Sequence, residues 1–124
     1  MASVKSYQDL RVWKEAMRLT VEVYKLTEMF PTHERYGLVS QLRRSAVSVP
    51  SNIAEGHARL STRDYLRHIS IAFGSLAELE TQLHLSRELG LANDQTIGEI
   101  LNCAASLGRQ IRSLSKSLRQ RLAD

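Results

Sequence analysis

The feature that most constrains the fold is an apolar stripe that recurs at steps of three and four residues in four segments of the chain. This spacing places the apolar side chains on one face of an α-helix. In the second segment the stripe consists of Val39, Leu42, Ala46, Val49, Ile53 and Gly56. Four amphipathic helices joined by short turns in 124 residues predict a single domain (1–124). Its expected fold is all-α, an antiparallel up-down-up-down four-helix bundle.

Capping residues predict where the helices begin and end. The first helix is expected to start near Asp9, a good N-cap, and to end before Pro31. Thr32 is the predicted cap of the second helix. The predicted ranges of the last three helices are 33–58, 62–89, and a fourth that is capped by Asn93 or Asp94 and ends near 122. Ser61 and Asp64 have the spacing of a capping box, and Gly90 is a typical left-handed stop.

Pro50 lies in the middle of the second segment. Within a helix, a proline lacks a backbone donor and clashes with the carbonyl four residues earlier, here that of Ala46, at a cost of about 3 kcal/mol. The apolar stripe nevertheless keeps its phase from Val39 to Gly56. We therefore predict one helix that is kinked at Pro50. Two helices joined near Ser48 are the alternative.

Positive charge is concentrated in the last segment. Residues 1–102 contain 12 Lys or Arg and 12 Asp or Glu, whereas residues 103–124 contain five Lys or Arg and one Asp. Four of these cations recur at steps of 3, 4 and 3 and form a ridge away from the apolar stripe: Arg109, Arg112, Lys116 and Arg119. A ridge of one sign is typical of a surface that neutralises phosphates. The alternative is a solvated face, where the helix dipole favours cations near the C-terminus.

Two adjacent arginines precede Pro50. Arg43 lies toward an apolar flank of the second helix, so its buried part needs a carboxylate, and Glu80 on the third helix is the predicted partner. Arg44 is expected to face outward. It is therefore a further candidate for binding nucleic acid.

The apolar residues of two helices exceed what one core can bury. The first helix has an apolar arc that approaches half its circumference. One flank of that arc includes Val12 and Leu19, and the other includes Met17. The third helix places Ile71 and Leu85 opposite its own stripe. Because exposed apolar patches usually mark interfaces, we predict a homo-oligomer whose subunits meet at Ile71, Leu85, Val12 and Leu19.

The sequence contains no pattern for catalysis or for a metal. A di-metal carboxylate bundle needs two Glu-x-x-His units, and no Glu here is followed three residues later by His. Cys103, the single cysteine, has no His near it in sequence, and there is no glycine-rich phosphate loop. We therefore expect neither an enzyme nor a cofactor. The single cysteine, together with the lack of a signal-peptide core or a long apolar segment, predicts a soluble cytoplasmic protein without a membrane anchor.

Three long motifs follow one another in a recognisable order. They are YQDLRVWK at residues 7–14, SVPSNIAEG at residues 48–56 and AFGSLAELETQL at residues 72–83. Together they resemble the 23S ribosomal RNA intervening-sequence proteins, a family that is similar to the accessory proteins of diversity-generating retroelements.

The resemblance implies an antiparallel four-helix bundle that assembles into a homopentamer. It also implies RNA or DNA as a ligand, or a reverse transcriptase or another protein as a partner, and it brings no catalytic residues. We therefore predict a non-enzymatic, homo-oligomeric accessory protein that binds nucleic acid through the basic ridge of the fourth helix. A protein–protein interaction scaffold with no nucleic-acid role is the alternative.

Overall fold

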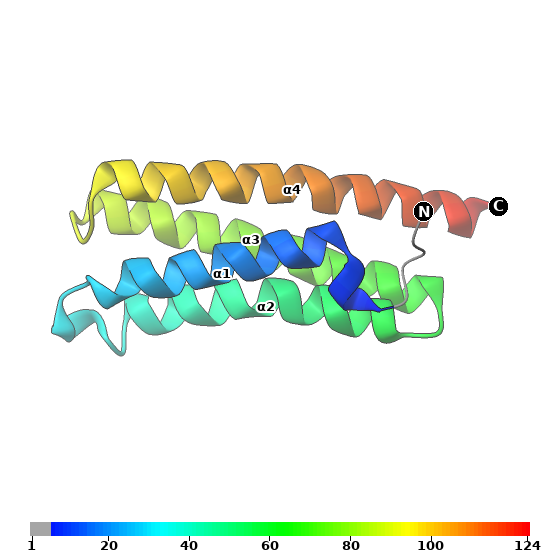
Figure 1. Ribbon diagram of the computed structural model, residues 1–124, viewed down its shortest axis with the longest axis horizontal. Helices are drawn as coiled ribbons and strands as arrows, with labels where there is room; N and C mark the ends of the chain where they lie inside the picture. Colours follow the sequence, from blue (N-terminus) through cyan, green and yellow to red (C-terminus); the bar gives the residue numbers. More distant parts are fainter. Residues whose placement is uncertain (1–5) are drawn as a thin grey trace.

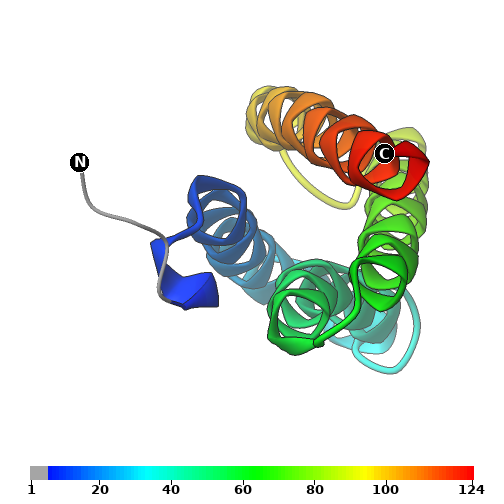
Figure 2. The same cartoon turned by 90° about the vertical axis from the view of Figure 1, so that its right-hand side faces the viewer.

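Four long α-helices make up most of the protein. The structure is a computed structural model that describes residues 6–124. Its helices are α1 (Arg11–Glu28), α2 (Leu38–Ala58), α3 (Thr62–Glu88) and α4 (Asp94–Ala123), with short 3-10 helices η1 (Tyr7–Asp9) and η2 (Thr32–Glu34) before α1 and α2. Consecutive helices run in opposite directions (Figure 1). Viewed end on, they surround a common axis in chain order (Figure 2). The protein is thus an all-α four-helix bundle, as predicted.

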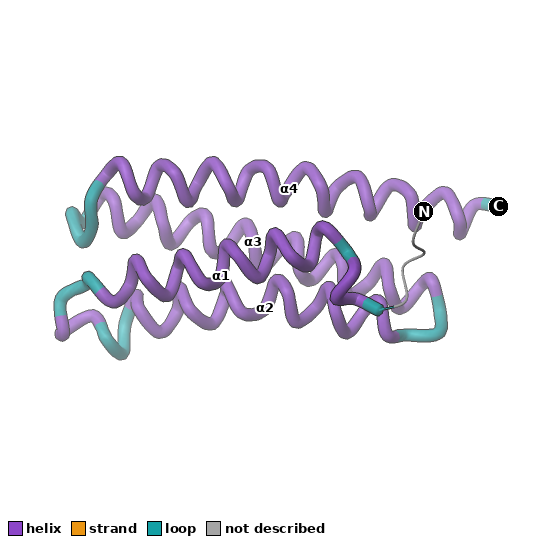
Figure 3. The backbone as a smooth tube through the Cα atoms, in the orientation of Figure 1, coloured by secondary structure: helices purple, strands orange, loops and turns teal. Residues whose placement is uncertain are grey.

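Short loops join the helices (Figure 3), and three of the predicted caps are present. Ser61 Oγ accepts a hydrogen bond from the amide of Asp64 at 3.1 Å, but within residues 6–124 the return bond of the predicted capping box, from the Ser61 amide to the Asp64 carboxylate, is not formed. Gly90 ends the third helix with a φ of 64°, a conformation that favours glycine. Asn93 Oδ1 accepts hydrogen bonds from two amides at the start of α4. These ends follow from local hydrogen bonds, which explains why the sequence predicts them.

Two predicted helix starts are corrected by the structure. Asp9 belongs to η1, where its carboxylate accepts from the amide of Ser6 at 3.2 Å, and α1 begins two residues later. Thr32 begins η2, and α2 starts only at Leu38. The backbone amides of Glu34, Arg35 and Gly37 donate hydrogen bonds to carbonyls three residues earlier, instead of four as in an α-helix. This segment is therefore a 3-10 turn that precedes α2.

The predicted apolar stripe of α2 is buried in the bundle, including Leu42 and Ile53, whose side chains have no exposed surface. The predicted stripe of α3 is likewise buried except for Tyr65, which is half-buried. The end of the α4 stripe differs from the prediction: Leu122 is 42% exposed. The C-terminal end of α4 extends beyond the start of α3, which runs in the opposite direction (Figure 1). The core therefore occupies most of the length of the bundle but not its C-terminal end.

α2 continues through Pro50 without interruption, which excludes the alternative of two helices joined near Ser48. Proline at this position leaves the carbonyl of Ala46 without its usual amide donor. The hydroxyl of Thr20 on α1 lies 3.1 Å from that carbonyl and can donate to it, and it also lies 2.8 Å from the carbonyl of Ala16. A neighbouring helix thus supplies the donor that Pro50 lacks. The kink itself stays a prediction.

We expect the contribution of Thr20 to depend on Pro50. Replacing Thr20 by valine should lower the free energy of unfolding by about 1 kcal/mol, because the Ala46 carbonyl loses its donor. In a Pro50→Ala background the amide at position 50 can bond to that carbonyl, so the same replacement should cost distinctly less. Urea unfolding of the two single variants and the double variant measures this coupling. Equal costs in both backgrounds would show that Thr20 does not compensate for Pro50.

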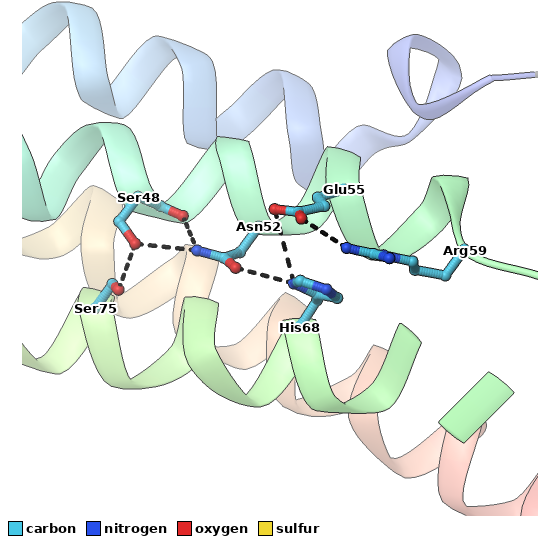
Figure 4. Close-up of polar contacts among 6 residues, drawn as sticks. All are labelled: Ser48, Asn52, Glu55, Arg59, His68 and Ser75. Atoms are coloured by element: carbon cyan, nitrogen blue, oxygen red, sulfur yellow. Dashed lines mark hydrogen bonds and ion pairs between the residues drawn. The ribbon is translucent and has the colours of Figure 1, made fainter. Parts of the chain in front are cut away.

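A row of polar contacts joins α2 to α3 within the 48–56 motif (Figure 4). The hydroxyls of Ser48 and Ser75 are 2.7 Å apart. Asn52 donates from its amide nitrogen to the Ser48 carbonyl at 2.8 Å, and its amide oxygen lies 3.1 Å from Nδ1 of His68. The motif thus supplies polar contacts that fix α3 against α2.

His68 is almost completely buried at the end of this row. Nδ1 of His68 contacts the amide oxygen of Asn52, whereas its buried Nε2 has no hydrogen-bond partner within residues 6–124. Glu55 lies 4.0 Å from Nδ1 and accepts from Arg59 at 2.8 Å. The row therefore ends in an exposed ion pair at the surface of α2.

Gly56 allows α2 and α3 to approach closely. A Cβ atom at this position would lie 2.7 Å from Cβ of His68 and 3.1 Å from the ring of Tyr65. The contact of 2.7 Å with His68 is shorter than real Cβ atoms allow, and both His68 and Tyr65 belong to α3. Only glycine fits here without a shift of the helix, which gives the last residue of the motif a packing role.

Candidate nucleic-acid interface

The four predicted cations of α4 form an exposed ridge along one face of that helix. Steps of 3, 4 and 3 residues keep them on one face, and all four side chains are exposed: Arg109, Arg112, Lys116 and Arg119. Ile111 and Leu118, which lie between them in sequence, are buried in the core. We call these four residues the basic ridge. Their arrangement follows directly from the amphipathic pattern of α4.

The basic ridge has no acidic partner in the part of the chain that the structure describes. Within residues 6–124, no carboxylate lies within 4.0 Å of any of its four cations, since none of the salt bridges involves α4. The contrast with α1 is direct, because Arg11, Arg18 and Lys25 each pair with a glutamate on the same helix. The positive charge of α4 is therefore available to an external anion.

Arg121 extends this positive charge toward the C-terminal end of α4. It lies close enough to Tyr65 on α3 to affect its ionisation. Burial raises the pKa of Tyr65 above its ordinary value, and the nearby positive charge of Arg121 partly offsets that rise. Arg121 was not among the predicted site residues because it does not continue the spacing of three and four residues that defines the basic ridge.

An exposed aromatic ring lies beside the basic ridge. Phe73 on α3 is 38% exposed, and the guanidinium of Arg112 lies 5.6 Å from the centre of its ring. Both residues line two neighbouring hollows between α3 and α4, with volumes of about 150 Å³ and 230 Å³. Arg109 lines the second hollow and Arg119 the first. We call this combined feature the α3–α4 groove.

Phe73 is the residue of this site that the sequence did not predict. Its place on the flank of the α3 stripe is compatible with a core residue. The structure places Gly108 on the facing helix next to this ring. A Cβ there would lie 4.0 Å from the Phe73 ring and 3.5 Å from Leu76.

Arg44 is exposed, as predicted, but it does not join the basic ridge. It lines a separate groove of about 480 Å³ between α1 and α2, together with Tyr24, Tyr36 and Val47. The α3–α4 groove is formed by the other two helices. Of the five residues predicted to bind nucleic acid, the structure therefore brings the four of the basic ridge together and places Arg44 apart from them.

The predicted ion pair between Arg43 and Glu80 is wrong. Arg43 instead lies 3.5 Å from the carboxylate of Glu28, donates to the hydroxyl of Thr27 at 2.8 Å, and stacks 4.5 Å from the centre of the Tyr24 ring. All three partners belong to the end of α1. The flank of α2 that carries Arg43 faces α1, whereas the prediction placed it against α3.

The predicted interface residues fall into two groups. Ile71 and Leu85 on α3 are 42% and 48% exposed. Val12 and Leu19 are corrected: they are only 8% and 3% exposed and belong to the core of the single chain. Both flanks of α1 are apolar, so its pattern does not show which flank faces inward. The exposed apolar residues of this helix are Met17, Val21 and Tyr24.

The remaining chemistry of the chain is sparse. Among residues 6–124, no three His, Cys, Asp or Glu side chains lie close enough together to hold a metal ion. Cys103 is a free, exposed thiol. In the same part of the chain, no helix combines the length and hydrophobicity needed to cross a membrane.

The fold and the basic ridge define a small helical-bundle protein, and comparison with known proteins identifies its family. Residues 8–113 match the family described as 23S rRNA-intervening sequence protein. The chain therefore belongs to the 23S rRNA-intervening sequence protein family, as its motifs predicted.

A solved structure supports the same fold. The crystal structure of a protein of unknown function from the S23 ribosomal protein family of Bacteroides thetaiotaomicron is similar to this one, with a TM-score of 0.75 and 22% sequence identity. The match covers 85% of this chain and 98% of that chain. At this identity the similarity shows the fold alone. No curated protein matches the chain.

Proposed function

We propose that this protein is a non-enzymatic, homo-oligomeric accessory protein that binds nucleic acid through the basic ridge. The observation that carries the proposal is the row of four exposed cations on α4 without a carboxylate partner in residues 6–124. Such a row supplies affinity for phosphates without reading sequence. The family name, which refers to an intervening sequence of 23S rRNA, supports nucleic acid as the ligand. A single cysteine supports the cytoplasm as its location.

Oligomerisation is the second part of the proposal. One subunit offers few phosphate contacts, but several linked subunits present them at high effective concentration to one long polyanion. The exposed apolar residues Ile71 and Leu85 on α3 and Val21 on α1 supply surface that a second copy can cover. The family resemblance suggests five copies.

We expect light scattering at micromolar concentration to give a mass that is a multiple of the 14.0 kDa chain, and five times that mass if the assembly is a pentamer. Replacing Ile71 and Leu85 together by glutamate should return the protein to a single chain, because two charges cannot be buried without partners in an apolar contact. A wild-type protein that is already monomeric would contradict the oligomer. A double variant that stays assembled would place the contact elsewhere.

A direct binding experiment tests the function. Fluorescence anisotropy of an RNA hairpin and of a duplex DNA should show binding of both at low salt. The dissociation constants should reach about 1–100 µM at physiological salt, the usual range for binding without sequence preference. If the wild-type protein binds neither nucleic acid at low salt, the basic ridge is only a solvated face, and the proposed function is wrong.

A protein–protein interaction scaffold is the alternative, and one observation favours it. The groove between α1 and α2 contains the exposed apolar and aromatic side chains of Tyr24, Tyr36 and Val47 beside Arg44. Aromatic residues and arginine are enriched at protein interfaces. Under this alternative the protein binds no nucleic acid at low salt, so the same anisotropy experiment separates the two functions.

A further inference from the structure

The α3–α4 groove combines two chemical features that one ligand class can satisfy together. Its floor presents the ring of Phe73, which is 38% exposed although phenylalanine gains free energy when it leaves water. The groove is also lined by three arginines, Arg109, Arg112 and Arg119, and by one carboxylate, Glu80. The cations outnumber the carboxylate, and none of them has a carboxylate within 4.0 Å in residues 6–124. A matching ligand carries negative charges and, beside them, a flat surface that can stack on a ring.

A nucleotide strand has both features. Its phosphates match the cations, and any base offers a face that can stack on an aromatic side chain. The basic ridge extends over ten residue steps of α-helix from Arg109 to Arg119, or about 15 Å, which is the length of about four stacked nucleotides. Phe73 lies beside the middle of this span, next to Arg112. A strand that follows the ridge therefore passes over the ring.

Base pairing decides which nucleic acid can use the ring. In a duplex the faces of the bases are stacked on one another inside the helix, so Phe73 cannot reach them while the ridge still contacts the phosphates. In a single strand or a loop the bases can unstack and turn toward the protein. The ring therefore adds affinity only for unpaired nucleotides.

We propose that the α3–α4 groove binds single-stranded nucleic acid and that one unpaired base stacks on Phe73 beside the guanidinium of Arg112. This inference rests on the proposed function, since it names the form of nucleic acid that the basic ridge prefers. Ser70 and Ser115 line the first hollow of the groove, where their hydroxyls can bond to the strand. A second copy of this chain is a poorer occupant, because it brings its own basic ridge and no excess of acidic residues.

Two substitutions at one position test the stacking. Phe73→Leu keeps an apolar side chain but removes the aromatic face on which a base could stack. Phe73→Trp keeps an aromatic face. We expect Phe73→Leu to weaken binding of oligothymidylate and of oligouridylate by about 5- to 100-fold, the range of one lost base–aromatic stack. Phe73→Trp should bind within about twofold of wild type. Comparing the two oligonucleotides shows whether the strand is DNA or RNA.

A blunt-ended duplex without a loop, with an equal number of phosphates, is the matched ligand. Its affinity should be the same for wild type and for Phe73→Leu, because the ring does not touch paired bases. Ultraviolet irradiation of the oligothymidylate complex should couple the strand to the peptide that contains residue 73, as mass spectrometry can show. This second readout does not depend on affinity.

The outcomes separate this inference from the proposed function. If Phe73→Leu binds single strands as tightly as wild type, or if both ligands lose affinity equally, stacking on Phe73 is refuted while binding at the ridge stands. If the wild type binds neither single strands nor duplex, the proposed function itself fails. Coupling of the strand to α1 or α2 instead of residue 73 would also overturn the inference.

Discussion

Replacing Arg112 and Lys116 together by glutamate should remove most nucleic-acid binding and leave the bundle folded. Both side chains are exposed and neither takes part in a salt bridge within residues 6–124, so their reversal should disturb no internal contact except the stacking of Arg112 on Phe73. Each reversal removes a phosphate contact and adds a repulsion. We expect affinity for an RNA hairpin to fall by at least about tenfold at low salt, measured by anisotropy.

The control for this variant is a second double reversal elsewhere on the surface. Arg18→Glu with Lys25→Glu changes the net charge by the same amount, but both cations lie on α1 and already pair with glutamates. This control should lose much less affinity. Circular dichroism of both variants should show wild-type helix content. If the two variants lose equal affinity, binding responds to net charge alone and the basic ridge is not the binding surface.

Gly56 should be among the least tolerant positions of α2. In a Gly56→Val variant the new Cβ would overlap His68 on α3, so the two helices must move apart. Overpacking of this kind typically costs about 1–3 kcal/mol, and we expect the upper part of that range because the overlap is with a buried Cβ atom and not with the end of a flexible side chain. The gain in helix propensity, about 0.5 kcal/mol, is too small to offset it.

Gly74 provides the matched control for this prediction. It also lies inside a helix, but a Cβ there meets nothing within 4 Å. Gly74→Val should therefore leave the free energy of unfolding unchanged or slightly higher. Urea unfolding of both variants measures the difference. If Gly56→Val is as stable as wild type, the α2–α3 contact at the end of the 48–56 motif is not as close as the structure shows.

Much of the fold was predictable because it depends on short-range patterns. The steps of three and four in the apolar stripes place the core of each helix, and they continue correctly through Pro50. The caps at Ser61 and Asn93 depend on atoms two or three residues away. The 3-10 turn before Leu38 was missed, because three-residue and four-residue hydrogen bonding can begin with the same capping residue.

What the sequence did not predict depends on contacts between helices. The pattern of α1 shows a wide apolar arc but not which flank faces the core, so Val12 and Leu19 were assigned to an interface although they are buried. Arg43 was assigned a partner on α3 when its flank faces α1. In the site, the four cations of α4 follow from their own spacing. Phe73 joins them only through the packing of α3 on α4, which a single sequence does not specify.

The salt dependence of binding tests the central claim most directly, since phosphate neutralisation by the basic ridge predicts its size. The affinity for duplex DNA should be measured from low to physiological salt for the wild type and for Arg112→Glu with Lys116→Glu. Plotted as log affinity against log salt, the wild type should give a steep negative slope. The slope of the variant should be shallower by at least about 1.8 units, because each of the two lost phosphate contacts contributes about 0.9. Two parallel lines would contradict the account, because the phosphates would then be neutralised somewhere other than the basic ridge.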